Sequence, residues 1–367
     1  MTETVTLTAG GREYRGWTEM TITRGIDRCA SHFEIGVTER WGMTDDPWRL
    51  VPFTPCTVSI GADLVLTGYV DEYRPGFDGT SHDVRVSGRS RTADLIDCTP
   101  DIAGGQYTGY SLAAIASGIA GLFAVGVQVE TALAQGAVAN AQMQRSETAF
   151  AFLERLARLA GVLLTDDENG DLVLGTAGSV RAAGRLVQGE NVLRAEGVLN
   201  GAHRFSEYIL KGQAGLRAAA SVQNAVEAVA RDAGVPRFRP TVKMAESALS
   251  VAGMQARANW LASYAAGRAT QAQITVPGYR QPDGTLWKIN QVVPVDCQWL
   301  GVAQDLLVAA VEFKLSAALG EETVLTVGPV EGYTPNPAEV KLHRVGRGKR
   351  HGHKGSLVNW SGAGGIG

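Results

Sequence analysis

Apolar and polar residues alternate along two long parts of this chain, and a different pattern separates those parts. Around 33–37 apolar side chains occupy every second position, which is the period of a strand with one buried face. A glycine turn at 61–63 predicts a tight hairpin, and alternation returns at 292–297. The pattern therefore predicts a small antiparallel β-barrel in residues 1–98 and a similar second barrel in residues 186–332.

Helical periodicity replaces alternation in residues 99–185. Between Ser146, an expected N-cap, and the stop signal Gly161, apolar residues recur at i, i+3, i+4 and i+7. The acidic segment 166–171 lies between two apolar runs and predicts a hairpin turn. A second helix is expected from a Ser111 cap onward. These signals predict a small α/β domain.

The second barrel contains an inserted helix at 247–267, with Met254 and Ala258 on one apolar face. Residues 213–235 are rich in alanine and lack a strong stripe, so we expect a loop or a marginal helix there. A discontinuous second barrel, which exchanges segments with the other domains, is therefore an alternative to a continuous one. The fold class predicted is α+β and mainly β, with two similar antiparallel β-barrel domains, a small α/β domain and a disordered C-terminal tail.

A faint internal repeat supports two similar barrels. An alternating strand at 64–73 and a returning strand at 84–88 form one hairpin. A second hairpin has the same plan, with strands at 306–315 and 324–328. The repeat predicts a structural duplication, and the alternative is a chance match of two hairpins.

The last residues, 333–367, form a basic and glycine-rich tail, with six lysines and arginines between 341 and 354. Such a composition cannot bury a core, so we expect the tail to be flexible in the isolated protein. Three roles are open to it: a solubilising tail, an arm that orders on a partner subunit, or a contact to nucleic acid.

Composition narrows the class of protein. The net charge of −3 argues against nucleic-acid binding that is driven by the overall charge of the protein. Four scattered cysteines fit small buried side chains in a reducing compartment, and the N-terminus has no signal-peptide pattern. The uncharged stretch 102–129 resembles a membrane span, but glycines and polar residues interrupt it, so we expect a buried helix followed by a strand.

Candidate catalytic and metal-binding groups are weak throughout. The chain has no HExxH, GxSxG or P-loop motif, and a GxGxxG match at 362–367 has no helix after it. Asp94 and Asp97 fit turn capping, and the acids at 166–171 fit a hairpin turn, because they lack the glutamate of a calcium loop. His351 and His353 would make at most an adventitious metal site in a flexible tail. We predict no catalytic, cofactor-binding or metal-ligating residues, no cofactor and no enzymatic activity.

Several short runs occur in a specific order along the chain. They include Val86–Cys98, Gly104–Gln106 and Phe205–Gly212, followed by the Asp-Gly-x-Leu-Trp run that begins at Asp283. In these runs the chain, from Val5 to about Tyr333, resembles the baseplate hub protein of contractile-tailed bacteriophages of the Mu type. That family is related to the T4 hub and to the hub part of type VI secretion spikes.

The resemblance implies a structural homotrimer in the phage tail baseplate of the virion, assembled in the host cytoplasm. Each chain would contribute two similar barrels, so that three chains present a pseudo-sixfold ring to the tail tube protein and a threefold end to the central spike protein. Neighbouring baseplate wedge proteins would also contact it. DNA would pass through the channel without specific binding, along polar or negative walls, and no membrane span is expected. The alternatives are a hub-type component of a related contractile injection system, a cell-wall hydrolase of the tail tip, and a receptor-binding tail protein.

Overall fold

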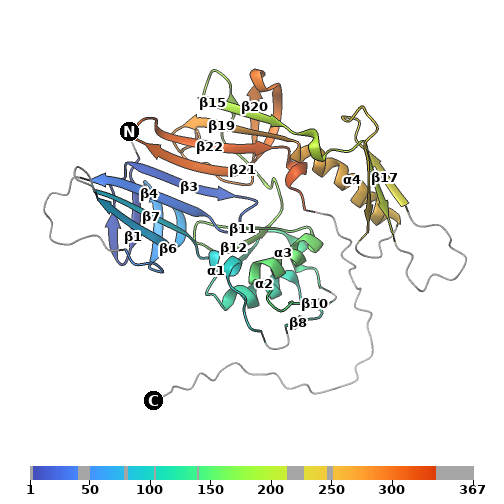
Figure 1. Ribbon diagram of the computed structural model, residues 1–367, viewed down its shortest axis with the longest axis horizontal. Coiled ribbons are helices and arrows are strands. Elements are labelled where there is room, and N and C mark those ends of the chain that lie inside the picture. The colour runs from blue at the N-terminus through green and yellow to red at the C-terminus, as the bar shows by residue number, and fades with distance from the viewer. Residues whose placement is uncertain are drawn as a thin grey trace, which may run out of the picture.

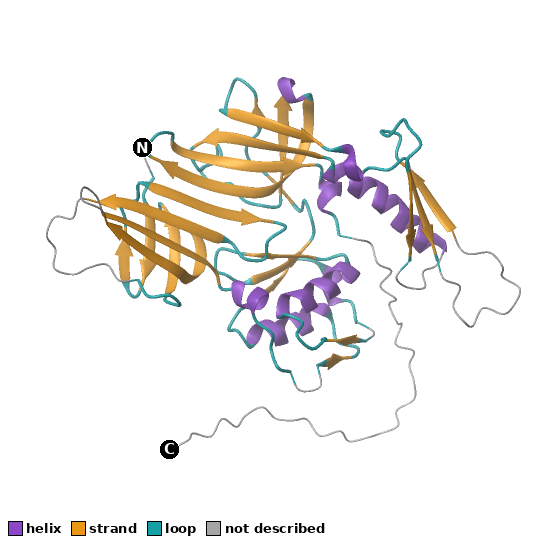
Figure 2. Ribbon diagram, viewed as in Figure 1, coloured by secondary structure: helices purple, strands orange, loops and turns teal. Residues whose placement is uncertain are grey.

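The computed structural model describes residues 3–39, 50–77, 82–102, 105–138, 140–212, 227–245 and 251–335. A large sheet dominates this part of the chain, and a helical module and a smaller sheet with one long helix adjoin it (Figures 1 and 2). The strands of the large sheet are β1 (Val5–Ala9), β2 (Arg12–Tyr14), β3 (Glu19–Gly25), β4 (His32–Glu39), β5 (Pro55–Ile60), β6 (Asp63–Phe77), β7 (His82–Ser90), β13 (Val180–Arg181), β14 (Leu186–Val187), β15 (Arg194–Leu199), β19 (Thr270–Pro277), β20 (Gln291–Cys297), β21 (Val302–Ser316) and β22 (Gly320–Gly328).

The main path of the sheet runs β15-β19-β22-β21-β3-β4-β7-β6-β5-β1-β2, and β20 pairs with β21 beside it. The hairpin predicted at the glycine turn 61–63 is present as β5–β6, and a second hairpin, β1–β2, precedes it. No closed barrel is found among the described residues, so the prediction of two barrel domains is not confirmed. Instead β3 pairs with β21, for example Ile22 with Phe313, and this joins both halves in one sheet.

One hydrophobic core lies beneath both halves of the sheet. The fully buried side chains alternate along their strands, as a half-buried strand requires. Ile22 and Phe33 from the first half belong to the same cluster as Phe313 and Leu325 from the second. Figure 1 shows the strands of the two halves side by side in the upper part of the molecule.

Five strands of the first half recur in the second half in the same chain order. β3, β4, β5, β6 and β7 correspond to β15, β19, β20, β21 and β22, and each pair of neighbours in the one set is a pair of neighbours in the other. β6 and β21 each have 15 residues, and β7 and β22 each have 9. Each long hairpin also contains one register shift, between Val70 and Glu72 and between Val308 and Ala310. The predicted pair of similar hairpins is therefore present.

A helical module follows β7 and has its own core. Thr148 caps its longest helix by accepting a hydrogen bond from the Ala151 N–H, and Gly161 ends that helix in a left-handed conformation. The predicted cap Ser146 is wrong, because its φ of 69° does not suit an N-cap. The elements are α1 (Ala93–Asp97), β8 (Gln106–Tyr107), α2 (Leu112–Gly121), β9 (Val127–Val129), η1 (Ala132–Gln135), β10 (Ala141–Gln142), α3 (Ala149–Ala160), β11 (Leu163–Asp166) and β12 (Leu172–Gly175).

The uncharged stretch folds as expected. Ser111 caps α2 by accepting from the Ala114 N–H, and β9 follows the helix and pairs with β12. Most apolar residues of α2 are buried against α3 and its neighbours. In the described part of the chain no helix has the length and apolar character needed to cross a membrane.

A second module interrupts the second half between β15 and β19. It contains η2 (Gly201–His203), β16 (Glu207–Lys211), β17 (Glu227–Arg231), β18 (Pro240–Met244) and α4 (Val251–Arg268). The expectation of a loop or helix is wrong at 227–231, because Ala228 and Ala230 alternate along a strand and pack with Met254 and Ala258 of α4. Residues 213–226, and the first residues of the helix predicted at 247–267, lie outside the described residues.

The chain leaves the second half through η4 (Val330–Tyr333), and η3 (Gln298–Leu300) links β20 to β21. Tyr333 was predicted to begin the flexible tail, but it is only 5% exposed and its hydroxyl accepts a hydrogen bond from Gln271. The remainder of the predicted tail, from 336, lies outside the described residues.

A buried carboxylate joins the helical module to the first half of the sheet. Asp166 accepts hydrogen bonds of 2.9 Å from both the N–H and the hydroxyl of Ser31. Arg24 donates to the Asp166 carbonyl oxygen at 2.9 Å. Burial raises the pKa of Asp166, although the nearby Arg24 charge and the bonds from Ser31 act in the opposite direction.

Replacing this carboxylate tests the junction. Asp166→Ala leaves the buried Ser31 hydroxyl without its acceptor, and leaves the Ser31 N–H with Ser90 Oγ as its remaining acceptor at 3.1 Å. It should lower the free energy of unfolding by about 1–3 kcal/mol, measured by urea denaturation. Asp166→Asn keeps an acceptor and should cost less.

Because the folded-state pKa of Asp166 is raised, folding takes up a proton at this residue. Its contribution to stability should therefore decline as pH rises through the raised pKa, and Asp166→Asn should remove that dependence. Equal losses for both variants at every pH would contradict this account.

Candidate functional site: a polar sheet face with two open edges

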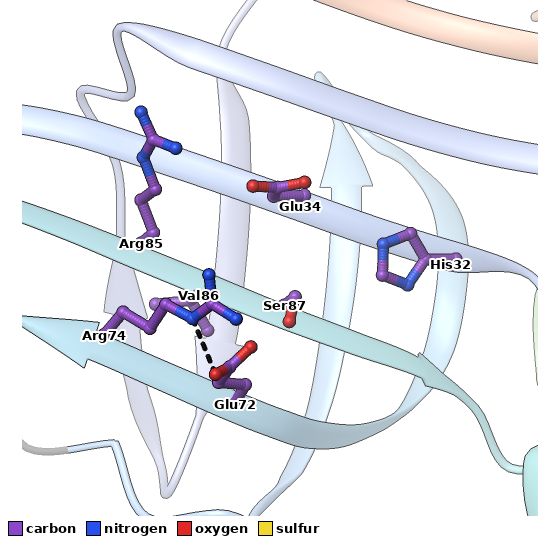
Figure 3. Close-up of a pocket in the computed structure, with 7 residues that line it drawn as sticks. All are labelled: His32, Glu34, Glu72, Arg74, Arg85, Val86 and Ser87. Atoms are coloured by element: carbon purple, nitrogen blue, oxygen red, sulfur yellow. Dashed lines mark hydrogen bonds and ion pairs between the residues drawn. The ribbon is translucent and has the colours of Figure 1, made fainter.

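The face of the sheet opposite the core carries polar and charged side chains. Figure 3 shows part of it, where His32 and Glu34 of β4 lie near Glu72 and Arg74 of β6 and Arg85 of β7. These residues alternate with the buried core residues of the same strands. The sequence pattern of one buried face thus leaves a continuous polar face across β6, β7, β4 and β3.

A shallow hollow on this face has a volume of about 140 Å³ and is lined by His32, Glu34, Glu72, Arg74, Arg85, Val86 and Ser87. Pockets for metabolites enclose roughly 300–1,000 Å³ and are mostly apolar, so this hollow does not have the character of a ligand site. Burial lowers the pKa of His32, with Glu34 and Asp71 acting in the opposite direction.

Each arginine and lysine on the strands of this face, among the described residues, has an acidic partner. The ion pairs are Arg74–Glu72 at 2.6 Å, Arg85–Glu19 at 3.9 Å, Arg89–Asp71 at 2.7 Å, Lys314–Glu312 at 3.0 Å and Arg194–Glu322 at 2.7 Å. Contacts to nucleic-acid phosphates need cationic side chains that are available to them. The polar face therefore offers no unneutralised basic stripe.

Two long strands of the sheet, β6 and β15, have a side on which no described strand pairs, and the short terminal strand β2 likewise pairs only with β1 among the described strands. From Asp71 onward β6 pairs with β7, and no described strand pairs with its other side. β15 pairs only with β19 among the described strands. Exposed edges present backbone N–H and C=O groups that can pair with another chain. Large apolar side chains are exposed at both edges, with Phe77 83% exposed on β6 and Leu199 80% exposed on β15.

An ion pair holds the β15 edge to the sheet. The Arg194 guanidinium donates to both carboxylate oxygens of Glu322 at 2.7 Å. Glu322 lies two strands away, on β22, and is only 5% exposed. A buried carboxylate needs such a partner, so Arg194 ties β15 to the body of the sheet.

Asp97 and Asp167, two of the acids considered as site residues, have structural partners. Asp97 accepts hydrogen bonds from Arg89, so an ion pair rather than the expected capping explains it. Burial and the neighbouring Asp97 raise the pKa of Asp94. Asp167 accepts from the Asn169 and Asp171 N–H groups within the predicted hairpin turn.

Among the described residues, no group of three or more histidines, cysteines, aspartates or glutamates has the geometry to hold a metal ion. The glycines at 362–367 and the two tail histidines lie outside the described residues. The prediction that the chain has no site residues is not tested by these observations.

Comparisons with known proteins agree with this architecture. Three family models match in chain order: the N-terminal part of the Mu phage baseplate assembly protein GpP-like family at 4–90, the second domain of the baseplate hub protein gp44-like family at 92–176, and the fourth domain of GpP at 250–336. The baseplate hub protein gp44 of Escherichia phage Mu is 33% identical over 98% of this chain and 96% of its own length. The chain belongs to the Mu baseplate hub protein gp44 family.

Several solved structures share the fold of this hub family member. A 43 kDa tail protein of prophage MuSo2 from Shewanella oneidensis has a TM-score of 0.82 and 33% identity, covering 90% of this chain and 99% of its own. A tail protein of Neisseria meningitidis has a TM-score of 0.77 at 22% identity, covering 92% and 99%. A type VI secretion component of E. coli, at 11% identity and a TM-score of 0.57, covers 91% of this chain and 80% of its own length and shares the fold alone.

Sequence reasoning identified the hub family and the duplicated hairpin but missed the two open edges. A signal was present in the long strand 64–73, because apolar alternation weakens after Val70 and the strand continues into Arg74 and Pro75. Pro75 is also typical of an edge strand, because it has no N–H to donate.

The anchor of β15 can be tested by substitution. Arg194→Ala leaves the buried Glu322 carboxylate without its guanidinium partner and should lower the free energy of unfolding by about 1–3 kcal/mol. It should also speed amide hydrogen exchange along β15. Arg181→Ala is the matched control, because the side chain of its bidentate partner Asp305 is 45% exposed, and it should cost less than about 1 kcal/mol. Equal costs for the two variants would show that burial of Glu322 is not what matters.

Proposed function

We propose that this chain is the structural baseplate hub of a contractile phage tail. In this proposal three copies form a homotrimer that joins the sixfold tail tube protein to the threefold central spike protein and encloses the DNA channel. The observation that carries the proposal is the duplicated five-strand unit, β3 to β7 and β15 to β22, within a chain of the Mu hub family.

Duplication provides a physical solution to a symmetry mismatch. A sixfold ring and a threefold spike cannot make equivalent closed contacts with each other directly. A chain with two similar units can present six similar units as a trimer while keeping only three copies of every other feature. The helical module and the module with α4 each occur once per chain, which fits the threefold end.

The polar face is the proposed channel wall. The other face of the sheet is covered by the core and by strands β1, β2, β5 and β20. The polar face is therefore the one that is left to line a ring. Its basic side chains are paired with acids, which favours passage of DNA without specific binding. A structure of the assembled hub in which unpaired arginines and lysines line the channel would refute this part of the proposal.

Several finer assignments follow from the hub role. The protein would be part of the virion, after assembly in the host cytoplasm, and would also contact neighbouring baseplate wedge proteins. The curated relative is named as a baseplate hub protein, which supports a structural rather than an enzymatic role. The shared fold of the type VI secretion component keeps a hub role in a related contractile injection system as the second candidate.

Solution mass gives the first test. Light scattering of the purified protein across concentration should give about three times the 38.8 kDa chain mass, alone or after addition of the tube and spike proteins of the same phage. Images of the particle should then show a pseudo-sixfold ring. A chain that remains monomeric with both partners present would refute the hub proposal.

Charge reversal on the polar face tests the channel. Glu34→Lys combined with Glu312→Lys would add two lysines along the proposed DNA path and would remove the acidic partner of Lys314. Phage carrying both changes should assemble normal tails but infect less efficiently, as measured by particle counts against plaque titre. Glu154→Lys on α3 is the control, because it changes charge on the helical module, and it should leave the titre unchanged. Equal titres for both phages would contradict a channel at this face.

A further inference from the structure

Positive charge in the folded part of this chain gathers outside the large sheet. The module with α4, residues 200–268, contains nine lysines and arginines against four aspartates and glutamates. Residues 1–199 and 269–335, which supply the sheet and the helical module, contain 19 against 32. The module with α4 therefore favours contact with anionic surfaces, and the rest of the folded chain disfavours it.

One face of the small sheet in this module packs on α4, and the other face does not. Tyr208 and Leu210 of β16 are buried in the core that α4 shares. Ile209 lies between them in sequence and points the other way, because side chains alternate along a strand. It pairs with Val229 of β17 and with Val242 of β18, so an apolar row crosses all three strands on the outer face.

The edge strand β18 carries the most exposed part of this apolar surface. Val242 and Met244 are on the same side of β18 and are 56% and 55% exposed. Phe238 lies two residues before β18 and is 84% exposed. Exposed apolar side chains that gather on one surface are typical of a contact site.

Two cations beside these apolar residues have no acidic partner in the described part of the chain. Other cations of the small sheet and its loops form ion pairs: Arg204, Lys211 and Arg231. Arg237, which adjoins Phe238, and Lys243 of β18 are exposed and form none. Lys243 points to the other side of this edge strand, and its long side chain lets the ammonium group reach around the edge.

We propose that this surface, the edge strand β18 with Arg237 and Phe238, binds the face of an anionic lipid bilayer. Phe238, Val242 and Met244 enter the region between the head groups and the acyl chains, and Arg237 and Lys243 bind lipid phosphates. Basic residues beside Phe and other apolar residues form the surfaces of proteins that lie in a membrane interface. The contact is peripheral and uses no membrane-spanning helix.

A bilayer fits this surface better than a nucleic acid does. Duplex DNA would offer phosphates to the two cations but would leave the three apolar side chains uncovered. An anionic bilayer offers phosphates and an apolar layer beneath them. The small sheet also projects from the rest of the molecule, at the right of Figures 1 and 2, as contact with a flat surface requires.

This inference goes beyond the hub role. The surface is complete within one chain, so it does not require a trimer. In the proposed trimer, however, three copies of the surface would lie at the threefold end, and three weak contacts would act together. That count rests on the proposed function, and the binding itself does not.

Flotation with lipid vesicles tests the role of the apolar residues. The full chain should float with vesicles of equal parts phosphatidylglycerol and phosphatidylcholine, and much less with phosphatidylcholine alone. Phe238→Ser should weaken binding to the anionic vesicles about tenfold or more, because an apolar side chain no longer leaves water. Phe238→Trp should keep the binding, since tryptophan favours membrane interfaces. Phe53→Ser is the matched control, because Phe53 is 85% exposed and lies outside the module, and it should bind like the unmodified chain.

Charge variants test the role of the cations. Arg237→Gln and Lys243→Gln should each weaken binding to the anionic vesicles about fivefold, and added salt should have a similar effect. Arg181→Gln with Arg185→Gln is the control, because it removes two positive charges from exposed ion pairs of the large sheet. This control should leave the binding unchanged.

No flotation of the unmodified chain, or equal flotation with both kinds of vesicle, would overturn the proposal. Equal losses in the control variants would also overturn it, because the contact would then lie elsewhere. A chain that ignores vesicles but retards duplex DNA, with the retardation lost in Arg237→Gln and Lys243→Gln, would assign the surface to nucleic acid instead. Light scattering of each variant reports the trimer separately, so failure of lipid binding in a trimeric protein leaves the hub role standing.

Discussion

The backbone ladder between β3 and β21 is the constraint on which the rest of the structure depends. It turns two similar groups of strands into one sheet, and their apolar faces form one core rather than two. A strand that lost this partner would expose backbone groups that water would have to satisfy. Because Ile22 and Phe313 face each other across the joint, neither half has a complete core without the other.

Much of the local structure could be predicted because it depends on neighbours in sequence. Alternation located most strands of the large sheet, and the Ser111 cap located α2. The cap of α3 was misplaced by two residues, since Ser146 and Thr148 are both good capping residues and only the backbone conformation distinguishes them. Strand β17 was missed because its buried residues are alanines, whose apolar signal is weak, and α4 supplies the missing contacts.

Features that depend on pairing between strands far apart in the sequence could not be predicted from the alternation of apolar and polar residues. The sequence repeat aligned Leu64 with Leu306, whereas the bulges align Leu64 with Val302. Alternation has a period of two, so a shift by an even number of residues leaves the pattern unchanged. Separate barrels were expected for the same reason, since alternation shows that a strand has one buried face but not which strand lies beside it. The open edges became visible only once every other pairing was known.

The two inserted modules and the chain exit lie at one end of the sheet. The helical module follows Ser90, the module with α4 follows Leu199, and the chain leaves the sheet after Gly328. At the opposite end, the connection from β6 to β7 has its counterpart between β21 and β22, and the connection from β4 to β5 has its counterpart between β19 and β20. The two ends of the sheet, which would form the two rims of a ring, are thus encoded by separate stretches of sequence. Mutation can lengthen or replace a module on one rim while the repeated loops of the other keep their spacing, so the two rims are free to evolve at different rates.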